Sequence, residues 1–233
     1  MKKVIISAAL LFTACSFTMA QDSGFKPAAG ANNLELNFVP LNGKPIQLTY
    51  IRYRRFLSET TAFRLGVGIS YSSTKADSVL KSNVTPGSTV ESTYKMNKMG
   101  WNLKPGIEKH MAGTDRLSPY IGAELDLAGQ SSKELTPVGL SPTDEVMTTT
   151  DKNKNKGGFF RLGLGLVAGF DCYIVKNLYL GTELGFGFQM VKYSDYKQTS
   201  VPAPATAKDP VSQGSETNIG PNFNSSIRLG YNF

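Results

Sequence analysis

The sequence is poor in the residues that build most catalytic and metal sites. Its 233 residues include two cysteines, one tryptophan and a single histidine, His110. It contains no metal-ligand cluster, no phosphate-binding loop and no Cys-His pair, so it predicts no metal and no cofactor. The formal charge of +7 is spread along the chain, which argues against nucleic acid as a partner.

A long apolar run is also missing. No stretch reaches the roughly 18 apolar residues of a membrane-spanning helix, which excludes a helical membrane protein. The 40% apolar content and the slightly negative mean hydropathy resemble those of a soluble protein. They equally allow a transmembrane β-barrel, because only alternate residues of its strands face lipid.

The N-terminus has the pattern of a secretory signal peptide. Two lysines precede an apolar run from Val4 to Phe12, and a small-residue cleavage site ends at Ala20. We therefore expect residues 1–20 to be a signal peptide and residues 21–31 to be a short periplasmic segment.

The signal region also allows a second interpretation. Phe12-Thr13-Ala14-Cys15 resembles a lipoprotein box, so lipidation at Cys15 is the alternative to cleavage after Ala20. Cleavage after Ala20 leaves Cys172 as the one remaining cysteine, and an intramolecular disulfide is then excluded.

From residue 32 onward the sequence alternates between apolar and polar residues. This two-residue period is that of a β-strand with one apolar face. The clearest example is the C-terminus, where Ile227, Leu229, Tyr231 and Phe233 are separated by polar residues or glycine. Eight such segments can be found, at about 32–39, 46–56, 61–72, 94–110, 119–129, from 158, 178–191 and 218–233.

Two places in these segments break the pattern. In the second segment the alternation directs Tyr50 outward, yet Arg52 and Arg54 share its parity. Either a bulge changes the phase, or these arginines lie in the headgroup region at the membrane edge. In the fourth segment Pro105 lacks an N–H group, so we expect a local bulge or kink there.

The connections between the segments alternate in length. Tight stretches lie near residues 57–60, 112–118 and 175–177, whereas long polar stretches cover residues 73–93, 130–157 and 193–217. The first link, near residues 40–45, is short and is the exception. Short turns at one end and long loops at the other are typical of bacterial outer-membrane barrels. The sequence therefore predicts an all-β fold: an eight-stranded antiparallel transmembrane β-barrel over residues 32–233, with short periplasmic turns and long extracellular loops.

The charged residues of the strands occupy the positions that alternate with the apolar ones, and so lie on the polar face of each strand. A lipid-facing arginine near the midplane costs about 2–4 kcal/mol, so these side chains are expected to point into the barrel and pair there. A soluble sheet with a solvated polar face is the alternative. The predicted interior polar network consists of Arg64, Lys104, Glu108, Glu124, Asp126, Arg161, Glu183 and Arg228.

The chain resembles the small outer-membrane barrels of the OmpA-type and OmpX-type families. The resemblance lies in the terminal Tyr231-Asn232-Phe233, the segment Pro119–Leu125 and the signal peptide. It implies a bacterial outer-membrane protein with both termini in the periplasm. It also implies that the barrel-assembly machinery recognises the last strand, where Leu229, Tyr231 and Phe233 would form the assembly signal.

Catalysis is not expected. Small barrels that resemble lipid A palmitoyltransferases and deacylases use a histidine at the outer rim, whereas His110 ends the fourth segment beside a short turn on the opposite, periplasmic side. We therefore predict that His110 is a polar surface residue and that the protein is not an enzyme.

The first functional hypothesis is a structural or surface-interaction protein acting through its extracellular loops. Its expected partners are outer-membrane lipid, lipopolysaccharide and an extracellular protein or glycan ligand. The run 152–156, with three lysines, is either a solvated loop or a contact to lipopolysaccharide. The second hypothesis is a pore or transport module for small solutes, and a third is an assembly factor for a secretion system.

Overall fold

A computed structural model describes residues 24–38, 46–81, 89–138, 149–154, 156–201 and 209–233, and this part of the chain forms ten strands. None of its segments is a helix with the length and apolar character needed to cross a membrane. The strands are β1 Asn32–Phe38, β2 Ile46–Ser58, β3 Thr61–Lys81, β4 Thr89–His110, β5 Leu117–Val138, β6 Thr149–Lys154, β7 Phe159–Val175, β8 Leu178–Tyr193, β9 Lys197–Val201 and β10 Ser215–Asn232.

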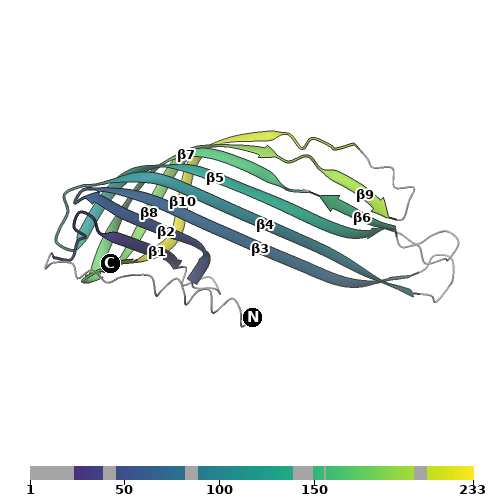
Figure 1. The fold of residues 1–233 in the computed structure, drawn as a ribbon, viewed down its shortest axis with the longest axis horizontal. Helices are drawn as coiled ribbons and strands as arrows, with labels where there is room; N and C mark the ends of the chain where they lie inside the picture. Colours follow the sequence, from purple (N-terminus) through teal and green to yellow (C-terminus); the bar gives the residue numbers. More distant parts are fainter. Residues whose placement is uncertain (1–23, 39–45, 82–88, 139–148, 155, 202–208) are drawn as a thin grey trace.

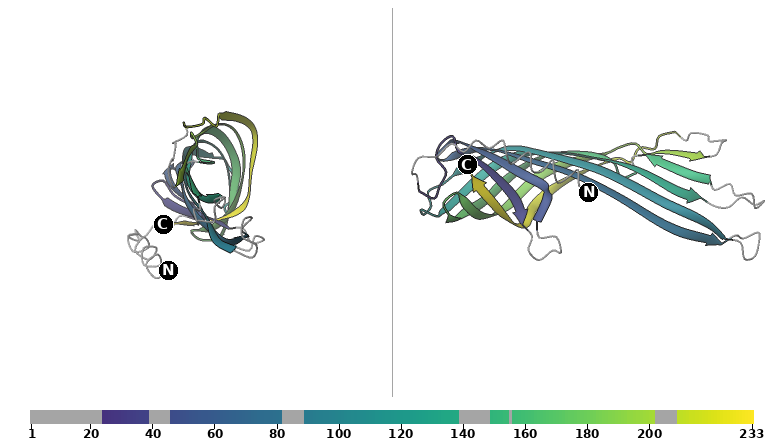
Figure 2. Two further views of the ribbon diagram at one scale, coloured as in Figure 1. Left: turned by 90° about the vertical axis from the view of Figure 1, so that its right-hand side faces the viewer. Right: turned by 60° about the horizontal axis from the view of Figure 1, so that its bottom comes forward.

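The strands pair antiparallel, and the pairings close on themselves. Starting from β1 they run through β2, β3, β4, β5, β7, β8 and β10 and return to β1. Figure 2 (left) shows these strands encircling a central space. Strand β6 pairs with β5 and β9 pairs with β6, outside the closed part. The all-β antiparallel sheet is as predicted, but the described chain has ten strands and not eight.

The additional strands lie where the sequence predicted polar loops. Strands β3, β4 and β5 have 21, 22 and 22 residues, against 7 in β1 and 13 in β2, and they run far beyond the shorter pair (Figure 1). Their far ends are polar on both faces, so no alternation of apolar and polar residues indicated strands there. These ends do contain threonine, valine and tyrosine, which favour strands. We call this part of the sheet the extension. It consists of β3 beyond Tyr71, β4 before Met99 and β5 beyond Gln130, together with β6 and β9.

Tight turns connect the strands at the opposite end. Residues 59–60 join β2 to β3, residues 111–116 join β4 to β5, and residues 176–177 join β7 to β8. In the last of these Asn177 has a φ of 70°, a left-handed conformation that asparagine adopts more readily than most residues. The chain therefore has tight turns at one end of the ring and long strands at the other, as the alternating spacing indicated.

The ring is apolar outside and charged inside. Along β7 and β8 exposed residues alternate with buried or half-buried ones, and Leu164 and Leu166 are 63% and 65% exposed. The largest fully buried side chains, in contrast, include Arg54, Arg64 and Arg228. In water this distribution would expose a large apolar area, which soluble monomers avoid.

An irregularity in β2 sets the orientation of its arginines. Leu36 pairs with Ile51, but the next residue, Asn37, pairs with Gln47, so β2 carries three extra residues at this point. An odd insertion reverses which face each later residue occupies. Of the two alternatives given by the sequence, the bulge is therefore present, and Arg52 and Arg54 are buried inside the ring.

The same bulge corrects the prediction for Tyr50. Tyr50 lines an interior cavity and does not point outward, because it shares the parity of Arg52 in a β2–β3 register that is unbroken from Tyr50 to Phe56. The bulge predicted at Pro105 is absent: Pro105 pairs with Leu65 in an unbroken β3–β4 register, and β4 keeps one register with β5 on either side of it.

The predicted signal peptide and Cys15 lie outside the described residues. Of the predicted periplasmic segment, residues 24–31 are described, and the Phe25 ring packs against the Arg116 guanidinium at 4.1 Å. This contact places the segment beside the β4–β5 turn.

Candidate functional site

The interior of the ring holds a cluster of ion pairs in which positive and negative charges balance. Each side chain in it belongs to a residue no more than 5% exposed. We call this set the ion-pair cluster: Arg52, Arg54, Arg64 and Arg228 with Glu35, Glu108, Asp171 and Glu183. Burying a charge is tolerated when it is paired and hydrogen-bonded, and four cations here face four anions.

Arg54 joins three strands across the ring from its position on β2. Its guanidinium lies 2.7 Å from Glu35 Oε1 on β1, 2.9 Å from Glu108 Oε2 on β4 and 2.8 Å from Asp171 Oδ2 on β7. It also donates a hydrogen bond to the Tyr179 hydroxyl on β8. A planar guanidinium with five N–H donors suits such a site, because one side chain can satisfy several carboxylates.

Glu183 on β8 accepts hydrogen bonds from side chains of β2, β3 and β5. Arg64 binds it through two contacts of 2.8 and 3.0 Å, Arg52 lies 3.2 Å away, and the Tyr120 hydroxyl donates at 2.6 Å. Arg228 on β10 completes the cluster, 3.0 Å from Glu35 and 3.1 Å from Asp171. The ion-pair cluster therefore links strands from every side of the ring.

Three tyrosines lie against glycines of the neighbouring strand. Tyr179 of β8 is opposite Gly230 of β10, and Tyr120 of β5 is opposite Gly169 of β7. A methyl group on Gly230 would lie 2.1 Å from the Tyr179 hydroxyl, and one on Gly169 would lie 2.6 Å from that of Tyr120. Tyr50 lies over Gly66 in the same way. These glycines are required because the rings occupy the space of a side chain.

The tyrosines in turn support the charges. The Tyr179 hydroxyl lies 2.5 Å from Glu35 Oε1 and 2.8 Å from Asn33 Oδ1, in addition to its contact with Arg54. A buried hydroxyl among ionised groups strengthens their network, since the local dielectric is low. Tyrosine packing and charge pairing are therefore coupled at this point.

His110 lies at the turn end of the ring and is buried, contrary to the predicted surface position. Its Nδ1 lies 2.9 Å from Ser118 Oγ and its Nε2 lies 3.4 Å from Glu108 Oε2. Its ring packs between Phe56 and Tyr120, with centroids 5.2 and 5.3 Å away. Ser, His and a carboxylate are thus adjacent, but all three are almost fully enclosed and offer no room for a substrate.

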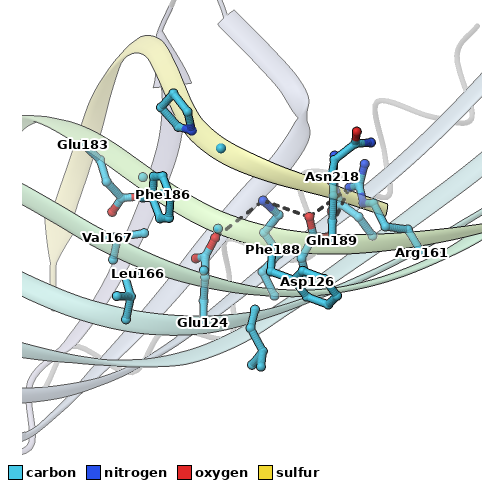
Figure 3. A pocket seen from close by; sticks show the side chains of 18 of the residues that line it. Glu124, Asp126, Arg161, Leu166, Val167, Glu183, Phe186, Phe188, Gln189 and Asn218 are labelled. Atoms are coloured by element: carbon cyan, nitrogen blue, oxygen red, sulfur yellow. Dashed lines mark hydrogen bonds and ion pairs between the residues drawn. The ribbon is translucent and has the colours of Figure 1, made fainter. Parts of the chain in front are cut away.

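A cavity of about 580 Å³ lies on the other side of the cluster. Its charged lining includes Lys104, Glu124, Asp126 and Arg161, as Figure 3 shows for the last three. Lys104 lies 3.5 Å from Glu124 and 3.7 Å from Asp126, and Arg161 lies 3.1 Å from Asp126. Arg52 and Glu183 belong to both the lining and the ion-pair cluster, so the cluster forms the floor of this cavity.

All eight residues of the predicted interior network face the inside of the ring, where each makes an ion pair. Arg64, Glu108, Glu183 and Arg228 belong to the ion-pair cluster, and Lys104, Glu124, Asp126 and Arg161 line the cavity beside it. Arg64 connects the two groups, with its guanidinium 3.0 Å from Glu124.

The sequence analysis missed four members of the cluster. Arg52 and Arg54 were left undecided because the β2 bulge is not visible in the alternation. Glu35 had the correct parity but stood in a short segment, and Asp171 stood beyond the clear part of its segment. The eight charges predicted to point inward balance, four positive and four negative. Placing Arg52 and Arg54 inside as well would have left two arginines in excess and pointed to two further carboxylates.

The three residues of the predicted assembly signal lie at the end of the ring. Leu229 and Tyr231 are exposed on the outer face of β10, and Phe233 exchanges backbone hydrogen bonds of 2.8 and 3.0 Å with Asn32. The described part of the chain contains no group of three histidine, cysteine or acidic side chains positioned to bind a metal ion.

The extension carries its own polar pairs. On its outer face, hydrogen bonds from Thr93 and Lys75 hold the pKa of Asp77 below its usual value. Glu134 of the extension lies 3.2 Å from Lys156, which stands between β6 and β7, and this contact raises the pKa of Lys156. Lys156 is the residue of the 152–156 run whose side chain is described, and here it serves an ion pair; the other side chains of that run lie outside the described residues.

Comparison with known proteins identifies the family. The chain matches the model of a family described as "Putative OmpA-OmpF-like porin family" over residues 45–208, more than half of its length. The crystal structure of Acinetobacter baumannii CarO2 is similar with a TM-score of 0.32 and 10% identity, covering 87% of this chain and 97% of that chain. No curated protein matches it in sequence. The chain therefore belongs to the OmpA-OmpF-like porin family and is a β-barrel of the bacterial outer membrane.

Proposed function

We propose that this protein is a non-enzymatic barrel, closed to solutes, that acts as a surface-interaction protein through its extension. The observation that carries the proposal is the ion-pair cluster, which links β1, β2, β3, β4, β7, β8 and β10 across the interior. An eight-membered ring of strands has an interior just wide enough for side chains to fill. A rigid barrel that does not conduct would serve as a base for the strands projecting beyond it.

The proposed orientation places the extension outside the cell. The tight turns and both described chain ends would lie in the periplasm, which is the usual arrangement of these barrels. Outward apolar residues on β3 run from Phe63 to Tyr71, which at the usual tilt covers roughly 20 Å of membrane thickness. Leu229, Tyr231 and Phe233 would then be read by the assembly machinery from the periplasmic side.

The absence of conduction is the first testable consequence. In planar lipid bilayers, the folded protein is expected to give no stable openings, because the ion-pair cluster leaves no continuous water path. An Arg161→Ala variant, which widens only the cavity above the cluster, is expected to behave in the same way. Stable current steps of uniform size from the unmodified protein would contradict the proposal.

A pore is the second candidate function. The cavity of about 580 Å³ with its charged lining favours it, since it would admit a small polar solute as far as the cluster. Transport would then require the cluster to separate. Uniform steps in the bilayer experiment would support this candidate directly.

The orientation can be tested by cysteine labelling in intact cells. In a Cys172→Ser background, Thr74→Cys on the extension is expected to react with a membrane-impermeant maleimide. Glu59→Cys, in the β2–β3 turn, is expected to react only after the outer membrane is permeabilised. The reverse pattern would show that the extension lies in the periplasm.

A further inference from the structure

Three lysines lie on the outer face of the sheet where its apolar surface ends. On β3 the outward residues Ile69 and Tyr71 are followed at the same parity by Ser73 and then Lys75. On the neighbouring strand β4, Trp101 and Met99 lie opposite Ile69 and Tyr71 in the β3–β4 register. Lys95 lies opposite Lys75.

The third lysine comes from β5. Lys133 pairs with Asn97 on β4, two residues from Lys95, and all three lysines are exposed. We call Lys75, Lys95 and Lys133 the lysine patch. It therefore spans three adjacent strands just beyond the apolar band and its aromatic residues Tyr71 and Trp101.

The arrangement of the lysine patch is unfavourable for the protein alone. Lys75 and Lys95 are directly opposite in the antiparallel register, and like charges in that position destabilise a sheet. Within the described part of the chain, Asp77, 3.3 Å from Lys75, is the one acid paired with the patch. Among the residues that the structure describes, neither Lys95 nor Lys133 makes an ion pair or a side-chain hydrogen bond. The patch therefore keeps a net charge of +2 that its surroundings do not neutralise.

We propose that the lysine patch binds the phosphate groups of lipopolysaccharide in the outer leaflet. Aromatic residues at the edge of the apolar band mark the interface, and lipid phosphates lie just beyond it, at the level of the patch. A phosphate monoester carries about −1.5 to −2 charges, which matches the +2 of the patch better than the single charge of a phosphodiester lipid does. The proposal rests on the orientation given above, with the extension outside the cell.

The test uses the folded full-length barrel in phosphatidylcholine vesicles. Trp101 is the one tryptophan of the chain and lies on β4 six residues from Lys95, roughly 20 Å along the strand. Energy transfer from Trp101 to trace dansyl-labelled lipid A therefore reports how strongly that lipid gathers there. The triple variant Lys75→Gln, Lys95→Gln and Lys133→Gln is expected to weaken the enrichment on the order of 10- to 100-fold.

A matched variant removes three exposed cations at the turn end instead: Arg55→Gln, Lys109→Gln and Lys176→Gln. It changes the net charge equally and should leave the enrichment unchanged. Loss of enrichment only in the patch variant supports the proposal, as does loss when the labelled lipid A is dephosphorylated. Equal enrichment by the unmodified protein and the patch variant overturns it. Equal displacement of the labelled lipid A by phosphatidylglycerol and by unlabelled lipid A also overturns it. Because the vesicle result does not depend on cellular orientation, its failure is distinguishable from a failure of the labelling experiment.

Discussion

Arg54→Ala is expected to lower the free energy of unfolding by about 3–5 kcal/mol, or to prevent folding altogether. The substitution leaves Glu35, Glu108 and Asp171 without their shared partner, in a site where Arg54 itself is completely buried. Uncompensated buried charge is among the largest single-residue penalties known. Denaturant unfolding in lipid vesicles, followed by Trp101 fluorescence and by gel mobility before and after boiling, measures the change.

The neighbouring arginine provides a matched control. Arg55 is exposed on the outside of the ring, so Arg55→Ala is expected to change stability by no more than about 0.5 kcal/mol. Arg54→Ala leaves three cations against four anions in the ion-pair cluster, so adding Asp171→Asn restores the charge balance and should recover part of the lost stability. An Arg54→Ala protein as stable as Arg55→Ala would show that the ion-pair cluster contributes nothing to the fold.

Gly230→Ala is expected to be nearly as damaging, although it adds only one methyl group. The new carbon would lie 2.1 Å from the Cζ and hydroxyl oxygen of Tyr179, which is fully buried. Overpacking costs about 1–3 kcal/mol, and displacing Tyr179 also breaks its hydrogen bonds to Glu35 and Asn33. The expected result is a large fall in the fraction of protein that shows heat-modifiable mobility.

Gly220 tests whether this effect is specific to the tyrosine contact. It lies on the same strand as Gly230, but a methyl group there would meet no atom within 4 Å. Gly220→Ala should therefore fold like the unmodified protein. If both variants fold normally, the Tyr179 ring moves aside at little cost, and the proposed coupling of tyrosine packing to the charges is wrong.

Most of the inward and outward assignments could be predicted from the sequence. On β3 the alternation from Phe63 to Tyr71 placed Arg64 inside, and on β8 it placed Glu183 inside, because a strand turns successive side chains to opposite faces. The tight turns were equally predictable. The extension was not, because strands that are polar on both faces have no alternation to detect.

The sequence alone determined that this chain forms strands with one apolar and one charged face, since the two faces of a strand depend only on the alternation of neighbouring residues. The tertiary structure alone decided which charges meet. Arg54 and Asp171 are 117 residues apart, and the β2 bulge, the register of each strand pair and the closure of the sheet together bring them into contact. It also buried His110 between Phe56 and Tyr120. Alternation fixes the face of a side chain but not its partner, because register is set by contacts between distant strands.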